Sequence, residues 1–304
     1  MTRPTPQQPA VPSVAQAALA LLAVQLVLGV WPVVGVLVLR HVSVQVLVGA
    51  RIVLAGPLLL LLTRPWRAGM SGREIARCAA LGWIGVILNQ TLFVEGLARS
   101  TPVNAAVLGC LIPAWTLLVA AALGHEKLER TKTLGVAVAL AGALLLVGAE
   151  RLDLGAERSL GNLLLASNGL MYATYLVLSR PLIARYGARP VVGWAFGLST
   201  PLILPYAGSA LVQTDWLAQP PEVALGLAYI VVGATVVGYL LSGWAMLVLP
   251  ASTAAAFSYT QPLITGVAAG GVLGERPGWQ VAAAAALIFA GVGVLTWGPR
   301  PSPR

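Results

Sequence analysis

The chain has 304 residues, of which 58% are hydrophobic and 10% are charged, and its formal net charge is +9. A soluble domain carries roughly 25% charged residues, so this composition excludes a domain that covers its surface with water-facing side chains. The positive net charge does not indicate a nucleic-acid partner, because excess Lys and Arg in membrane proteins marks the cytoplasmic loops. We therefore predict an integral membrane protein that contacts membrane lipids and no nucleic acid.

Along the chain, a short polar tail precedes a series of long uncharged segments. Residues 1–12 are rich in Pro and Gln and predict a disordered N-terminal tail, and the apolar segment after them is too long for the core of a signal peptide. Each later segment has the length of a helix that crosses roughly 30 Å of hydrocarbon. We predict an all-α membrane protein with ten transmembrane helices, at residues 14–39, 44–62, 75–97, 102–123, 133–149, 160–179, 190–207, 223–247, 251–273 and 278–297.

The longest uncharged segment accounts for two of these helices. No Asp, Glu, Lys, Arg or His lies between Val223 and Gly274. At roughly 1.5 Å per residue, this segment is more than twice as long as the hydrocarbon core is thick, so it has to cross the membrane twice. Pro250 lies in its middle, where it ends one helix and starts a tight turn into the next.

The distribution of basic residues predicts the orientation of the chain in the membrane. With the N-terminus in the cytoplasm, thirteen Lys and Arg residues fall on the cytoplasmic side and five on the other, so both termini are expected in the cytoplasm. The cytoplasmic set is Arg3, Arg64, Arg67, Arg73, Arg77, Lys127, Arg130, Lys132, Arg180, Arg185, Arg189, Arg300 and Arg304, and the outer set is Arg40, Arg99, Arg151, Arg158 and Arg276.

The two halves of the chain repeat one pattern. Five helices per half is an odd number, so the second copy enters the membrane upside down relative to the first. Such an inverted repeat has two nearly equivalent packings, one open to each side, which is the physical basis of alternating access in carriers. A duplicated bundle that serves only as a scaffold is the alternative. We expect repeats at 13–150 and 151–298 and a C-terminal tail at 299–304, because a shift of 149 residues places Pro113 on Pro262, Glu126 on Glu275, Lys127 on Arg276 and Gly142 on Gly291.

Polar and aromatic side chains inside the predicted helices form the candidate substrate site. A side chain that hydrogen-bonds is costly in hydrocarbon unless it faces the bundle interior, a partner or a water-filled cavity. The alternative for each residue is a hydrogen bond between helices or a place at the membrane interface. The row Asn168, Tyr172 and Tyr175 on the sixth helix is the strongest candidate. The full set of substrate-binding candidates is Gln25, Trp31, Asn89, Phe93, Trp115, Asn168, Tyr172, Tyr175, Tyr239, Ser258, Tyr259 and Gln261.

Arg51 is the one formal charge well inside a predicted helix, and an unpaired charge there is costly. Glu95 lies at a comparable depth on the third helix and is a possible partner, while Arg99, one turn later, competes for it. We favour a structural Arg51–Glu95 pair over a contact between Arg51 and the substrate.

Several kinds of chemistry lack the residues that they need. There is no carboxylate at mid-depth for proton coupling, and no GxxxxGK[ST] loop for ATP. Neither His41 nor His125 has a His or Cys at ligand spacing, and Cys78 and Cys110 are expected to be buried structural residues. We therefore expect no metal site, no cofactor and no enzymatic activity.

Three stretches resemble the EamA modules of the drug/metabolite transporter superfamily. They are the run Ala50-Arg51-Ile52-Val53-Leu54-Ala55, residues 112–142 and residues 261–291. The resemblance covers essentially the whole chain and is greatest to YddG-type amino-acid exporters. It implies a cavity lined mainly by helices one, three, four, six, eight and nine, in the bacterial inner membrane. The second half departs from the first, with Trp194-Ala195-Phe196 in place of Gly49-Ala50-Arg51, so symmetry does not double a role of Arg51.

The expected function is therefore a secondary carrier that exports amino acids, with aromatic or hydrophobic ones favoured, or related small metabolites. Within transport, the alternatives are carriers of drugs or of nucleotide-sugar-type metabolites. Outside transport, they are a membrane scaffold and a lipid-modifying membrane enzyme. The sequence leaves both a monomer and a homodimer open.

Overall fold

A computed structural model describes residues 11–100, 102–147, 155–264 and 279–297, and these form helices with no strand among them. Serines begin three of the first helices: the side chains of Ser13, Ser43 and Ser71 each accept a hydrogen bond from a backbone N–H of the first turn. The main helices are α1 (Val14–Leu39), α2 (Val44–Thr63), α3 (Gly72–Gly82), α4 (Asn89–Ala98), α5 (Pro102–Gly109), α6 (Ile112–Ala122), α7 (Arg130–Val147), α8 (Ser159–Tyr186), α9 (Ala188–Gln213), α10 (Pro221–Ala228), α11 (Gly238–Ala245), α12 (Ala251–Ala256) and α14 (Trp279–Trp297).

The described helices lie where the uncharged segments predict them, with differences at their ends. The sixth predicted helix, α8, continues to Tyr186 instead of ending at 179, and the seventh, α9, continues to Gln213 instead of 207. The predicted helix 102–123 is broken at residues 110–111 into α5 and α6, and Pro113 lies in the first turn of α6, where its missing backbone N–H costs least. The predicted tails, and parts of the predicted helices 133–149, 251–273 and 278–297, lie outside the described residues.

Two π-helices interrupt corresponding helices of the two halves. The first, η2 (Trp83–Leu88), joins α3 to α4, and the second, η5 (Tyr229–Val237), joins α10 to α11. Their last residues are 237 − 88 = 149 positions apart, which is the shift of the sequence repeat. A π-turn adds a residue to the helical turn and changes which side chains face inward, and it is common at functional sites. A 3₁₀ segment, η6 (Phe257–Thr260), continues α12.

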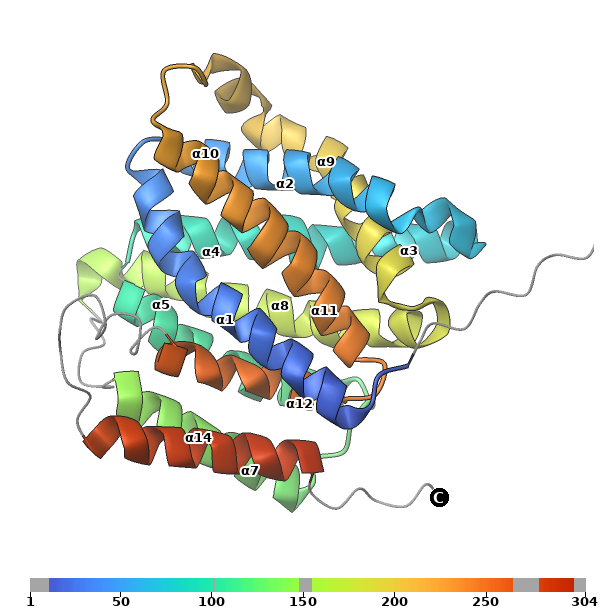
Figure 1. Ribbon diagram of the computed structural model, residues 1–304, viewed down its shortest axis with the longest axis vertical. Coiled ribbons are helices and arrows are strands. Elements are labelled where there is room, and N and C mark those ends of the chain that lie inside the picture. Colours follow the sequence, from blue (N-terminus) through green and yellow to red (C-terminus); the bar gives the residue numbers. More distant parts are fainter. Residues whose placement is uncertain (1–10, 101, 148–154, 265–278, 298–304) are drawn as a thin grey trace, which may run out of the picture.

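The helices pack in pairs that join the two halves (Figure 1). α2 lies along α9, and α7 lies along α14, while α1 crosses α11 and α4 packs on α8. Glycine permits the close approach of α7 and α14: a Cβ added to Gly291 would lie 2.5 Å from the carbonyl oxygen of Gly135 and 2.7 Å from the Cβ of Ala139. Small residues therefore set this helix–helix distance.

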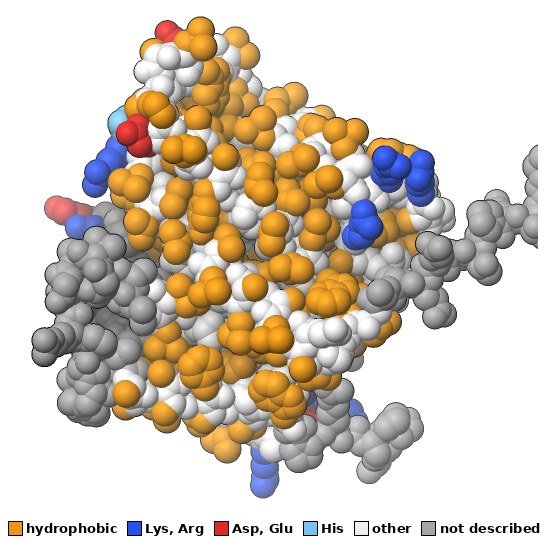
Figure 2. All heavy atoms as spheres, viewed as in Figure 1, with side chains coloured by type: hydrophobic (Ala, Val, Ile, Leu, Met, Phe, Trp, Pro, Cys, Tyr) orange, Lys and Arg blue, Asp and Glu red, His pale blue; other side chains and the backbone are white. Residues whose placement is uncertain are grey.

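The surface suits a lipid environment. Within the described ranges, five helical segments are long and apolar enough to cross a bilayer, and Val107–Ala122 and Ala282–Trp297 are shorter apolar helices. On the face shown in Figure 2, charged side chains gather near the edges and the broad middle is hydrophobic. The five long segments are Val14–Leu39, Val44–Thr63, Gly72–Ala98, Ala188–Gln213 and Pro221–Ala245.

Candidate substrate cavity

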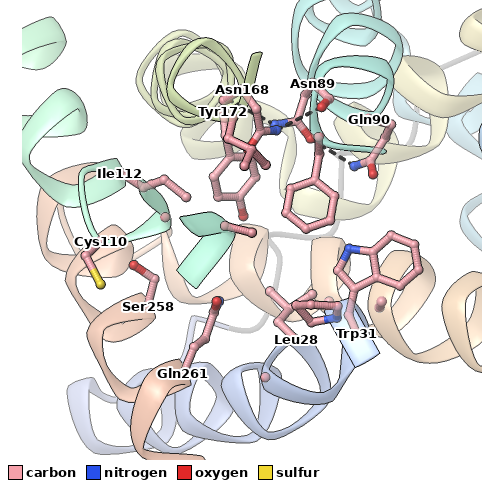
Figure 3. A pocket seen from close by; sticks show the side chains of 18 of the residues that line it. Leu28, Trp31, Asn89, Gln90, Cys110, Ile112, Asn168, Tyr172, Ser258 and Gln261 are labelled. Atoms are coloured by element: carbon pink, nitrogen blue, oxygen red, sulfur yellow. Dashed lines mark hydrogen bonds between the residues drawn. The ribbon is translucent and has the colours of Figure 1, made fainter. Parts of the chain in front are cut away.

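A cavity lies between helices of both halves. Figure 3 shows side chains from several helices converging on it. Eight of the predicted substrate-binding residues line it: Trp31, Asn89, Phe93, Asn168, Tyr172, Tyr239, Ser258 and Gln261. The other described lining residues are Leu28, Gly29, Pro32, Arg51, Gln90, Ala105, Gly109, Cys110, Ile112, Leu165, Ala234, Gly238 and Pro262.

Aromatic rings form one wall of the cavity. The rings of Trp31 and Phe93 stack with their centroids 5.9 Å apart. Tyr172 stacks on Tyr175 at 6.3 Å, and the edge of Tyr239 meets Tyr172 at 6.3 Å. These rings come from α1, α4, α8 and α11, so the wall spans both halves. Apolar walls with a few polar groups are typical of small-molecule sites.

Two asparagines hold α4 against α8. The side-chain nitrogen of Asn89 donates to the carbonyl oxygen of Asn168 at 3.3 Å, and that of Asn168 donates to the carbonyl oxygen of Asn89 at 2.8 Å (Figure 3). Both residues line the cavity, but these amide N–H groups are already bound to the backbone. Their structural role is therefore established by the geometry, while contact with a substrate stays a prediction.

A pair of repeat-related residues meets beside the cavity. Gln90 Nε2 donates to the hydroxyl of Tyr239 at 3.0 Å, and these two residues are 149 positions apart. The Tyr239 hydroxyl in turn donates to the carbonyl oxygen of Gly85, inside the π-helix η2, at 2.9 Å. Two equivalent residues of a twofold repeat touch only near its axis, so this contact marks where the axis of the predicted repeat is expected. Gln90 is absent from the predicted site, although the shift of 149 from Tyr239 points to it.

Arg51 is the one formal charge among the described lining residues, and it is 3% exposed. Its Nε donates to Thr235 Oγ1 at 2.7 Å, and its Nη1 donates to Gln90 Oε1. The centre of its guanidinium lies 4.9 Å from the centroid of the Trp31 ring, which is a cation–π distance. Arg51 therefore ties α2 to η2–α4, η5 and α1 at the cavity wall.

The preferred Arg51–Glu95 pair is wrong. Glu95 pairs with Arg99 on the same helix, and it accepts a hydrogen bond from the Tyr206 hydroxyl at 2.8 Å. The reason is helical rotation: Gln90, which reaches Arg51, and Glu95 are five residues apart, so they point about 140° away from each other around the helix. Similar depth in the membrane does not place two side chains on facing sides.

Four predicted site residues lie behind the cavity wall. Gln25 accepts a hydrogen bond from Gln261 Nε2 at 2.6 Å. Tyr175 is buried behind Tyr172. Tyr259 is fully buried, and neither its hydroxyl nor Trp115 Nε1 has a hydrogen-bond partner among the described residues. These four shape the wall without lining the space.

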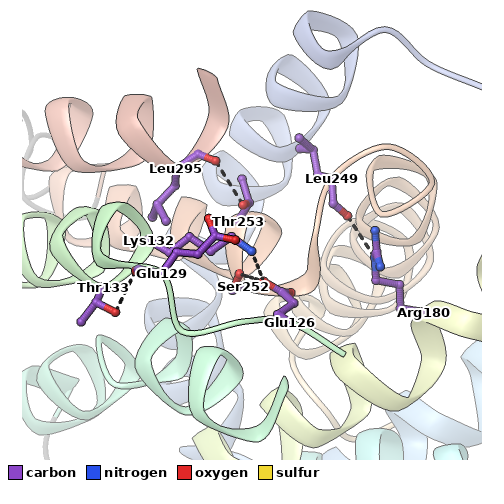
Figure 4. A network of polar contacts seen from close by, with 9 residues as sticks. All are labelled: Glu126, Glu129, Lys132, Thr133, Arg180, Leu249, Ser252, Thr253 and Leu295. Atoms are coloured by element: carbon purple, nitrogen blue, oxygen red, sulfur yellow. Dashed lines mark hydrogen bonds and ion pairs between the residues drawn. The ribbon is translucent and has the colours of Figure 1, made fainter. Parts of the chain in front are cut away.

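At one end of the bundle, polar contacts join the two halves (Figure 4). The Glu126 carboxylate accepts from Ser252 N at 3.2 Å and from Ser252 Oγ at 2.5 Å, and Lys132 Nζ lies 3.1 Å from Glu126 Oε2. We call Glu126, Lys132 and Ser252 the Glu126 latch. Ser252 lies in the first turn of α12, where a carboxylate also faces the positive end of the helix dipole.

The cavity lies away from the latch. Beside the latch, Arg180 Nε donates to the carbonyl oxygen of Leu249, near the end of α8 (Figure 4). The α8 residues that line the cavity, from Leu165 to Tyr172, lie in the first half of that helix. The cavity therefore lies toward the end of the bundle opposite the latch.

Comparisons with known proteins agree on one family. The EamA-like transporter family matches residues 15–148 and, a second time, residues 159–297. An uncharacterized transporter of Archaeoglobus fulgidus is 26% identical over 258 residues, which cover 81% of this chain and 85% of that protein. A probable terminal-alkyne amino-acid exporter of Streptantibioticus cattleyicolor is 25% identical over 220 residues, 72% of each chain. A solved crystal structure with 20% identity superposes with a TM-score of 0.72 over 93% of this chain and 96% of its own.

Proposed function

The chain belongs to the EamA-like transporter family, and we propose that it is a secondary carrier that exports amino acids or related small metabolites by alternating access. The observation that carries the proposal is the central cavity, which is lined by both halves and crossed by the pseudo-twofold axis between Gln90 and Tyr239. A scaffold has no need for such a cavity, whereas a carrier with inverted repeats places its substrate site there.

The proposed architecture is ten transmembrane helices in two inverted repeats, 13–150 and 151–298, in the bacterial inner membrane with both termini in the cytoplasm. The family matches the chain once in each half, which supports the division. The start of α1 and the end of α14 lie on the same side of the bundle in Figure 1, as an even number of crossings requires. The excess of Lys and Arg at the loops on this side supports its assignment to the cytoplasm.

In this orientation the Glu126 latch lies at the cytoplasmic end, so the described conformation is closed toward the cytoplasm. The exchange between conformations opens the latch and closes the outer end. The π-helices η2 and η5 lie in equivalent helices beside the axis. A change in the number of residues per turn at these positions moves the two halves in a related way. The Gln90–Tyr239 contact lies at the axis. In the other conformation the same pair either keeps this contact or adopts the geometry related to it by the twofold rotation.

The cavity chemistry favours amphipathic solutes. The rings of Trp31, Phe93 and Tyr172 offer surfaces for stacking an aromatic or hydrophobic side chain. The described lining residues include no Asp or Glu, the groups that efflux of cationic drugs requires. The amino-acid exporter named among the relatives supports the same substrate class.

The test is transport by the purified full-length protein in liposomes loaded with individual amino acids. We expect efflux of aromatic or hydrophobic amino acids, and a strong decrease in Tyr172→Ala, which removes a ring from the cavity wall. Tyr206→Ala is the matched control, because Tyr206 contacts Glu95 and does not line the cavity. Absence of flux for every amino acid, in protein that is folded by size-exclusion chromatography, refutes the proposal.

A further inference from the structure

We propose that Arg51 is the anion-binding group of the cavity and that the transported substrates carry a carboxylate which its guanidinium binds. That these ligands are transported rests on the proposed function, whereas their binding to Arg51 is a property of the cavity itself. It replaces the purely structural role expected of Arg51 and narrows the substrate class from amphipathic solutes to carboxylates.

The positive charge of Arg51 is not compensated by a carboxylate of the described residues. A buried guanidinium normally has a carboxylate partner, because removal of a charge from water is costly unless an opposite charge compensates it. Among the described residues, Arg51 has no such partner: its hydrogen-bond acceptors are the neutral side chains of Thr235 and Gln90. The Trp31 ring offsets part of the cost through its π-face. A bound carboxylate supplies the missing negative charge.

The hydrogen bonds of Arg51 leave one edge of its guanidinium available to a ligand. A guanidinium has five N–H groups, and Arg51 uses one on Nε and one on Nη1 within the protein. Its Nη2 makes no hydrogen bond to a described residue, yet it is absent from the fully buried polar atoms that lack a partner. The Nη2 edge therefore faces the cavity that Arg51 lines. The two hydrogen bonds fix the orientation of the fork, so it is pre-organised to bind a carboxylate.

The side chains around Arg51 suit a ligand that has both a carboxylate and an apolar part. The stacked rings of Trp31 and Phe93 lie next to the guanidinium, so a solute whose carboxylate binds Arg51 places its apolar part against them. The described lining residues offer no second charge of either sign to compete for the ligand. This arrangement distinguishes a carboxylate from an amine or an amide of the same shape.

The experiment compares three matched compounds with the purified full-length protein: 3-phenylpropionate, its neutral isostere 3-phenylpropanamide, and the cation phenethylamine. Binding is measured as the ligand-dependent rise in the unfolding temperature. We expect 3-phenylpropionate to bind roughly tenfold to hundredfold more tightly than the amide, which corresponds to the loss of a charged hydrogen bond. Phenethylamine is expected to bind most weakly. This comparison needs no variant, so it does not depend on how a substitution folds.

Variants then assign the selectivity to Arg51. Arg51→Gln is expected to abolish the preference for the carboxylate, and Arg51→Lys to retain part of it through charge without the fork. Arg99→Gln is the matched control, since Arg99 is half-exposed and outside the cavity. Equal binding of acid and amide by the unaltered protein, no binding of any of the three, or unchanged selectivity in Arg51→Gln overturns the inference. Carboxylate binding without flux of any amino acid contradicts the proposed function and leaves the anion site in place.

Discussion

Glu126→Gln is expected to open the cytoplasmic end of the bundle. The Glu126 side chain is 4% exposed, and it accepts two hydrogen bonds from Ser252 and one from Lys132. Glutamine keeps the shape and one acceptor oxygen, but it loses the charge and turns the other oxygen into a donor. A hydrogen bond to a charged group contributes about 1.5–3 kcal/mol, and the partly exposed Lys132 pair adds at most about 1 kcal/mol.

The closed state therefore loses about 2 kcal/mol relative to the open one, which is roughly a 30-fold change in their ratio. The assay is the rate at which a membrane-impermeant thiol reagent labels Ser258→Cys in inside-out vesicles, with Cys78 and Cys110 replaced by Ser. Ser258 lines the cavity, so its labelling from this side requires an open latch. We expect the rate to rise in Glu126→Gln.

Glu129→Gln is the control for this experiment. It removes the same charge from the same loop, but the Glu129 side chain has no hydrogen-bond or ion-pair partner among the described residues. Its backbone carbonyl accepts from Thr133 Oγ1 at 3.1 Å (Figure 4). Labelling from the cytoplasmic side that is unchanged in Glu126→Gln, or raised equally in Glu129→Gln, refutes the assignment of the latch.

Three further predictions follow from packing, hydrogen bonding and topology. Gly291→Ala is expected to lower the yield of folded protein and destabilise it by about 1–3 kcal/mol, because its Cβ meets α7, whereas Gly293→Ala on the same helix has open space and is expected to be neutral or stabilising. Tyr239→Phe leaves the Gly85 carbonyl inside η2 without its hydrogen bond, so a thermal melt should show a loss of about 1–2 kcal/mol together with slower flux. Single cysteines at Arg67 and Ala218, in equivalent loops of the two halves, should be labelled from opposite faces of the membrane, and labelling from one face contradicts the inverted repeat.

The positions of the helices were predictable because the membrane penalises charge along a whole segment. The ends of the helices were less predictable, because a charged residue marks the edge of the hydrocarbon whereas a helix can continue beyond that edge. Arg180 lies beyond the predicted end of its helix, yet α8 runs on to Tyr186 with Arg185 in its last turn, where a cation faces the negative end of the helix dipole. The ten-helix count stays a prediction.

The cavity was predictable to the level of a helix face and no further. Polar side chains at spacings of three or four residues, such as Asn168 and Tyr172, do share the cavity wall. The π-helices were not predictable, because their backbone geometry has no simple sequence pattern, and they decide which residues of the following turn face inward. Gln90, in the turn that follows η2, reaches Arg51, whereas Glu95 turns away toward Tyr206.

In the proposed mechanism the repeat accounts for the motion and the charge of Arg51 accounts for the selectivity, and the two need not share one symmetry. A twofold backbone is useful to a carrier because its inward-open and outward-open packings then have similar free energies. A solute with one carboxylate needs only one guanidinium, so a charge in one half suffices. In the second half Phe196 takes the place of Arg51, and it is an uncharged, fully buried side chain. The related helices of the two halves and the single charge of Arg51 therefore fit the proposed carrier of small carboxylates.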